Sequence, residues 1–169
     1  DDCIAIKSGR NADGRRVGVA AENILVSNYE KKAGHGGVVM GSELSGGIRN
    51  VFVENCRMSS PDLERGIRIK TNAMRGGRVE NLNVRKLEVG TVKDLFEINF
   101  YYEEGENGPF SPVVRDISFQ DVHCENAERV MDMRGFGHAP IRAVRLVNVK
   151  VDTATKPSRV ANVEGLSFD

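Results

Sequence analysis

Cysteine, long apolar segments and net charge are all scarce in this chain of 169 residues, and each scarcity excludes something. The formal charge is zero, from 24 basic and 24 acidic side chains, so bulk electrostatics favours neither nucleic acid nor a membrane surface as a partner. No apolar run approaches the roughly 18 residues that a membrane-spanning helix needs. We therefore expect no nucleic-acid partner and no membrane partner.

The three cysteines are Cys3, Cys56 and Cys124, and none of them shows the C-x-x-C spacing of a metal site. We therefore expect no metal ion. Each cysteine stands among alternating apolar residues, which favours a small buried hydrophobic side chain over a disulfide. With so few cysteines, the redox compartment stays open.

A six-residue pattern occurs five times: Asn, aliphatic, any residue, apolar, any residue, polar. The copies are residues 23–28, 50–55, 81–86, 116–121 and, in degenerate form, 143–148, with start-to-start spacings of 27, 31, 35 and 27. Repeats of this length indicate a stacked architecture. Asn at one fixed place in each copy predicts a ladder of hydrogen-bonded side chains along the stack.

Inside each copy the apolar residues alternate with period two, and Val, Ile and Phe are favoured, which predicts a strand. Stacking one strand per repeat gives parallel pairing, so the sequence predicts an all-β, right-handed parallel β-helix. Leucine-rich repeats lack support because the Leu-x-x-Leu-x-Leu frame is missing, and helical repeats fail on periodicity. We expect one domain over residues 1–169, with about five to six coils.

A second strand follows at the same pace, over residues 3–7, 38–42, 67–71, 95–99 and 130–133. After residue 152, residues 153–158 indicate a turn and residues 160–168 indicate a further strand. All motifs with chemical potential lie on or beside the second strand, and neighbouring strands lie about 4.8 Å apart. Motifs one repeat apart, at Asp1, His35 and Arg68, are therefore predicted to share one cleft.

Three motifs stand out: Asp1-Asp2, Gly34-His35-Gly36 and Arg68-Ile69-Lys70. Period two places both cations of the last motif on one face and the isoleucines in the core. Taken singly, each motif is more often an ordinary turn, a loop or a solvated strand face. Adjacent strand residues face opposite ways, so the Asp pair is predicted at the start of a strand or at a bulge.

These motifs, in this order on a β-helix repeat, resemble glycoside hydrolase family 28, the polygalacturonases and their relatives. The resemblance covers essentially the whole chain, and residues 4–9 and 37–43 are more similar to the bacterial, often exo-acting members. It implies a glycosidase that cleaves α-1,4-galacturonosidic bonds of polygalacturonate or pectin by an inverting general acid/base mechanism, without a cofactor. A family tyrosine on the next coil is matched by Tyr102, with Tyr101 as a neighbour.

The resemblance implies a role for each matched residue. Asp1 is the general acid, Asp2 acts on the attacking water, and His35 supports the protonation of the acid. Arg68 and Lys70 bind the substrate carboxylate, and Tyr102 packs against the same sugar. Glu43, Glu97 and Asn99 fall near the expected cleft without an assigned role, while His123 and His138 are expected to be structural or exposed.

The family has an Asn-Thr-Asp motif on a coil before Asp1, whose Asp holds the attacking water. We therefore expect this chain to be a C-terminal fragment, with N-terminal coils missing, an incomplete site and no activity by itself. Two further alternatives stay open: a pectate-lyase-like enzyme acting by β-elimination, and a carbohydrate-binding β-helix that does not cut. From the polymeric substrate we expect a secreted or periplasmic monomer.

Overall fold

The computed structural model describes residues 1–31 and 34–169. These residues form eleven strands and one short helix, in the order β1 (Asp2–Ile6), α1 (Asn11–Val17), β2 (Ala21–Ser27), β3 (Glu30–Lys31), β4 (Gly36–Gly41), β5 (Ile48–Met58), β6 (Arg65–Lys70), β7 (Arg78–Asn99), β8 (Val113–Arg134), β9 (Ile141–Ala154), β10 (Arg159–Ala161) and β11 (Val163–Phe168). No helix of the described part is long and apolar enough to cross a membrane.

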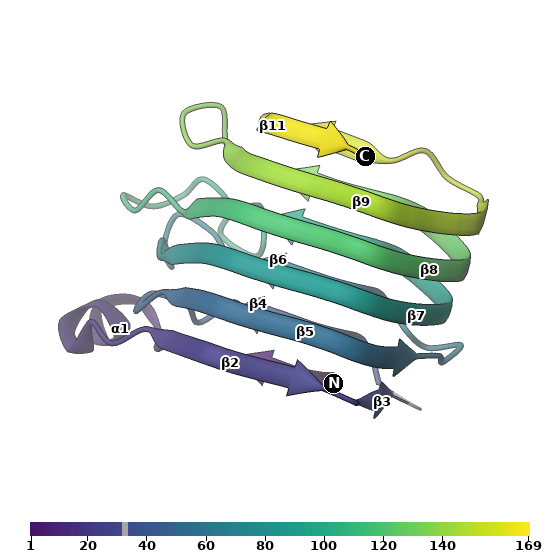
Figure 1. The fold of residues 1–169 in the computed structure, drawn as a ribbon. Helices are drawn as coiled ribbons and strands as arrows, with labels where there is room; N and C mark the ends of the chain where they lie inside the picture. The colour runs from purple at the N-terminus through teal and green to yellow at the C-terminus, as the bar shows by residue number, and fades with distance from the viewer. Residues whose placement is uncertain (32–33) are drawn as a thin grey trace.

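Each pairing between these strands is parallel, and each strand pairs with its counterpart one coil away. Figure 1 shows the coils stacked from the N-terminus at the bottom to the C-terminus at the top. One column of the stack joins β1, β4 and β6 to the last part of β7, and the other joins β2 and β5 to its first part. The prediction of a parallel β-helix is confirmed.

The two predicted strands of a repeat merge in the middle of the stack. β7 and β8 each run through both segments, over 22 residues. The register between them continues through the corner, from Val89 opposite Cys124 to Asp94 opposite Arg129. Because both coils bend together, the hydrogen-bonded ladder continues through the corner, and Gly90 does not end a strand there.

The six-residue repeat begins and ends at backbone corners. Its first residues have φ between 53° and 59°, and its last residues have φ between 51° and 54°, in all five copies. Asn and Asp tolerate this left-handed conformation better than most other side chains, which is why they recur there. The predicted ladder is confirmed: Asn81 donates to Asn50 Oδ1 at 2.8 Å, and Asn50 donates to Asn23 Oδ1 at 3.1 Å.

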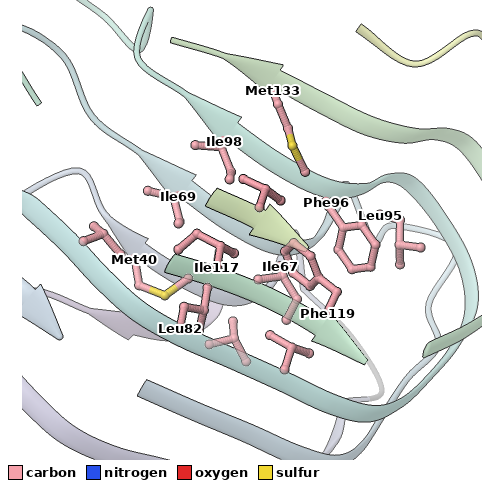
Figure 2. Packing of buried hydrophobic residues seen from close by; sticks show 14 of the residues in the cluster. Met40, Ile67, Ile69, Leu82, Leu95, Phe96, Ile98, Ile117, Phe119 and Met133 are labelled. Atoms are coloured by element: carbon pink, nitrogen blue, oxygen red, sulfur yellow. The ribbon is translucent and has the colours of Figure 1, made fainter. Parts of the chain in front are cut away.

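Aliphatic and aromatic side chains from all faces of the coils fill the interior (Figure 2). Phe96 of β7 stacks on Phe119 of β8 with ring centroids 3.9 Å apart, and both are buried. Cys56 and Cys124 are buried in this core, which confirms their interpretation as small hydrophobes, whereas Cys3 is only partly buried. Burial raises the pKa of the Cys124 thiol to about 11.

One outward-facing row of side chains alternates between acidic and basic residues over its first four members and ends with a second basic residue. Its members are in register from coil to coil: Glu30, Arg57, Glu88, His123 and Lys150. His123 also bonds through Nδ1 to Glu88 at 3.0 Å and through Nε2 to Asp152 at 2.9 Å. We call these five residues the charged row.

Helix α1 was not predicted, because its seven residues span too few turns to show helical periodicity. The guanidinium of Arg15 lies 3.6 Å from the ring centre of Phe110, which ties the helix to the loop after β7. Near the C-terminus, the expected strand over residues 160–168 is found as β10 and β11.

Candidate active site on the β1–β4–β6 sheet

The three motifs lie on adjacent strands of one column, but not in one line. Asp2 opens β1 opposite Gly36 of β4, and Gly36 lies opposite Arg65 of β6. Arg68 instead lies opposite Val39, three residues further along the strands. Arg68 is therefore offset from His35 along the strands, and the ion pair of Lys70 with Asp2 spans this offset.

Asp1 and Asp2 stand where β1 starts, as predicted. Asp1 is exposed, whereas the Asp2 side chain is 13% exposed. The backbone N–H of Asp2 donates to Asp1 Oδ1 at 2.8 Å, which fixes the first carboxylate relative to the second. The Asp2 carboxylate lies over Gly36, where a Cβ atom would come within 2.5 Å of Asp2 Oδ1. A side chain at position 36 would therefore crowd the Asp2 carboxylate and also Val39, whose Cγ2 lies 2.6 Å from the same Cβ position.

His35 lies in the loop before β4, and its main chain links three coils. Its N–H donates to the carbonyl of Asp1 at 3.1 Å, and its carbonyl accepts from the N–H groups of Glu64 and Arg65 at 2.8 and 3.1 Å. The residue is exposed, and among the described residues its imidazole makes no hydrogen bond or ion pair. Its backbone is therefore fixed beside Asp1 while its ring faces solvent. Residues 32–33, just before this loop, lie outside the described residues.

The Arg-Ile-Lys motif of β6 alternates as predicted. Ile67 and Ile69 are buried in the core, and Arg68 and Lys70 point to the opposite side. Lys70 Nζ lies 2.9 Å from Asp2 Oδ2, with both side chains largely shielded from solvent. This ion pair joins the first and the last of the three motifs.

Tyr102 is the tyrosine that faces this cluster. Its ring centre lies 5.6 Å from Arg68 Cζ and 5.3 Å from Lys70 Nζ, and the residue is half-buried. Tyr101 is exposed, hydrogen-bonds Glu106 at 3.2 Å and packs edge-on against Phe136. The structure thus separates two neighbours that the sequence left confusable.

The carboxylate that holds the basic groups belongs to Glu97, a residue to which the sequence assigned no role. Glu97 of β7 is 2% exposed, and its Oε2 contacts Arg65 Nε and lies 3.2 Å from Arg68 Nε. Arg65 Nε is also 3.3 Å from Asp94 Oδ2. Glu97 lies opposite Arg68 in register. The sequence signal that could have identified Glu97 was therefore an acidic residue one coil after a basic one.

Further basic and acidic groups extend this array toward the C-terminal coils. Asp132 of β8 is buried and pairs with Arg134 and with Arg159 of β10. At the other end, Lys7 Nζ lies 2.7 Å from Glu43 Oε2, and this bond holds the pKa of the Glu43 carboxyl below its usual value. In residues 1–31 and 34–169, no three His, Cys, Asp or Glu side chains are grouped to hold a metal ion.

The family model described as glycosyl hydrolases family 28 matches residues 1–167. The chain belongs to this family. A "Probable polygalacturonase" of Vitis vinifera is 30% identical over 176 residues, which cover 99% of this chain and 35% of that protein. A polygalacturonase of Ralstonia nicotianae is 30% identical over 142 residues, covering 80% of this chain and 25% of that protein.

A solved structure gives the same result in three dimensions. The crystal structure of a hyperthermoactive exopolygalacturonase from Thermotoga maritima superposes with a TM-score of 0.89 and 32% identity, over 100% of this chain and 39% of that chain. The chain spans about a third or less of the length of the two curated relatives from Vitis vinifera and Ralstonia nicotianae. Family membership rests on nearly all of its residues, including the strands that carry the acidic pair and the Arg-Ile-Lys motif.

Proposed function

We propose that the protein is a glycoside hydrolase that cleaves α-1,4-galacturonosidic bonds of polygalacturonate or pectin. The observation that carries the proposal is the Lys70–Asp2 ion pair of 2.9 Å, which joins an acidic pair to a basic, aromatic-lined patch. Galacturonate carries one carboxylate per sugar, so an enzyme acting on it needs both carboxylic acids for chemistry and cations for binding. Family membership and polygalacturonase relatives support this substrate class.

The two carboxylates are proposed to divide the work of an inverting hydrolysis. Asp1 donates a proton to the leaving oxygen, while Asp2 helps a water attack the opposite face of the sugar. Support comes from their placement: Asp1 is exposed at the start of β1, whereas Asp2 is shielded and paired with Lys70. The group that activates water must be a carboxylate, and the ammonium of Lys70 beside Asp2 suits that role.

His35 is proposed to serve the acid rather than to act as a nucleophile. Its main chain is bonded to Asp1, and its ring is the titratable group of the loop next to that residue. An imidazole in this place can accept a proton and return it to the acid after each turnover.

Arg68, Lys70 and Tyr102 are proposed to bind the sugar. Arg68 is held from behind by Glu97, and the two cations flank the tyrosine ring at 5.6 and 5.3 Å. A guanidinium and an ammonium on one face provide a bidentate and a point-charge contact for a carboxylate.

We also propose that these 169 residues do not turn over substrate by themselves, because the sequence contains no Asn-Thr-Asp motif. The complete gene product is proposed to act as a monomer outside the cytoplasm, secreted or periplasmic, where a pectic polymer is accessible. Cell fractionation and analytical ultracentrifugation test these two points.

The decisive assay incubates the complete gene product with polygalacturonate in the presence of EDTA, following new reducing ends and ultraviolet absorbance together. Reducing ends without absorbance, lost in Asp1→Asn and kept in the exposed control Asp62→Asn, are expected. Absorbance of an unsaturated product indicates a lyase and contradicts hydrolysis. Binding of oligogalacturonate without turnover, unchanged in Asp1→Asn and Asp2→Asn, indicates a non-catalytic binding protein.

A further inference from the structure

Lys31 is a buried lysine next to the candidate site for which the proposed reaction has no use. It ends β3, lies opposite Met58 of β5, and is only 2% exposed. Its Nζ donates to the carbonyl of Gly34 at 2.7 Å. Lysine is almost never fully buried unless it is paired, because the ammonium loses its hydration.

Burial also lowers the pKa of the Lys31 ammonium, and the nearby Cys3 and Asp2 only partly oppose this effect. Those two groups face Lys31 from β1, whereas Met58 on β5 carries no charge. An apolar side chain of similar length fills such a space without a desolvation cost. Packing alone therefore does not explain why a charged lysine occupies position 31.

The loop that Lys31 contacts is pressed tightly against β1. Gly34 has φ of 113°, and a Cβ atom there would come within 2.5 Å of Cys3 Sγ and 3.0 Å of the Asp1 carbonyl oxygen. The next residue, His35, bonds to that same carbonyl through its N–H. The Gly34 carbonyl held by Lys31 is thus one residue away from the contact between His35 and Asp1.

We propose that Lys31 is a positioning residue, whose buried ammonium holds loop 34–36 and thereby fixes His35 beside Asp1. Its catalytic consequence rests on the function proposed above, since His35 and Asp1 matter to turnover only if the protein is a hydrolase. The local geometry does not rest on that function. Lys31 stays away from the substrate, so it acts on the rate of the chemical step rather than on binding.

The test compares Lys31→Met, which keeps the shape but removes donor and charge, with Lys31→Gln, which keeps a donor. The exposed Lys150→Met serves as the matched control. In the complete gene product, kcat on polygalacturonate is expected to fall roughly tenfold in Lys31→Met and less in Lys31→Gln, with KM within about twofold. The melting temperature is expected to stay equal or to rise, because a desolvated charge is removed.

A second readout is independent of activity. The imidazole C–H resonances of His35 should shift in Lys31→Met, and in the wild type they should show an alkaline inflection below 10.5, the ordinary lysine pKa. Both substitutions should abolish that inflection. If the wild type does not hydrolyse polygalacturonate, the proposed function fails, and the His35 signals alone decide the positioning role.

Three outcomes overturn the inference. The first is an unchanged kcat with unchanged His35 signals in Lys31→Met. The second is a fall in melting temperature that tracks the loss of activity, which indicates a merely structural role. The third is an alkaline inflection that persists without Lys31.

Discussion

Replacing Glu97 by Gln tests whether one buried carboxylate holds the basic side of the site. Glu97 is 2% exposed and contacts both Arg65 and Arg68 through a single oxygen, Oε2. The substitution keeps the shape and an acceptor oxygen but removes the negative charge between two guanidinium groups. The Arg65 and Arg68 side chains are 23% and 17% exposed, so solvent compensates only part of the loss.

Removing one partner of a fully buried ion pair costs about 3–5 kcal/mol. Two features reduce this figure here: Gln still accepts a hydrogen bond, and Arg65 keeps Asp94 at 3.3 Å. We therefore expect a loss of about 2 kcal/mol in the free energy of unfolding. For a chain of this size, such a loss lowers the melting temperature by about 4–8 °C.

Thermal and urea unfolding of Glu97→Gln measure this loss. Glu128→Gln is the matched control, because Glu128 pairs with Lys156 in an exposed ion pair and its loss should leave the melting temperature unchanged. A Glu97→Gln protein as stable as the wild type, or a control that loses as much, refutes the argument. Either result means that the carboxylate does not hold the array.

Three further predictions concern the scaffold. Asn50 has a φ of 55° and makes two ladder hydrogen bonds. Asn50→Ala should therefore lower the free energy of unfolding by about 1–2 kcal/mol, and Asn50→Gly by less, because glycine adopts a positive φ freely. Equal losses for the two variants in urea unfolding contradict the left-handed corner. The pKa of His123 is raised above 6.5, first by the hydrogen bond to Asp152, so this contribution to stability is complete below pH 6.5 and is lost as pH rises through the raised pKa. NMR titration should show a midpoint above 6.5 that falls in Asp152→Asn, and a wild-type midpoint at or below 6.5 contradicts the pairing. Cys124, with a pKa of about 11, should react with iodoacetamide at neutral pH only after unfolding, and labelling of the native protein at the unfolded rate excludes the burial.

The fold was predictable because each coil repeats a local requirement. A corner in the left-handed region selects Asn or Asp, and a half-buried strand selects alternating apolar residues, so both appear in the sequence at fixed spacing. Helix α1 was not predicted from the sequence, because it is a single insertion that no other coil of the described residues repeats. The merging of strands in β7 and β8 was not predicted, because a shared bend leaves the ladder intact through Gly90, a residue type that usually indicates the end of a strand.

The candidate site was predictable only as a set of motifs. Ion pairing between coils is invisible in the order of residues, which hid the buried carboxylate of Glu97. The burial of the Lys31 ammonium against the carbonyl of Gly34 is equally invisible there. The register offset of Arg68 depends on how many residues each corner consumes, and this number varies between coils. The repeat period therefore predicts which strands lie side by side. It does not predict which side-chain atoms come into contact between them.

The charged row also favours the native stacking order of the coils during folding. Coils of a β-helix have nearly the same shape, so a coil stacked in the wrong order would fit sterically. In the native order Arg57 lies between Glu30 and Glu88, and His123 follows Glu88. Skipping one coil would place Glu30 against Glu88, where like charges repel. The alternation from Glu30 to His123 thus disfavours assembly of these four coils in a shifted order.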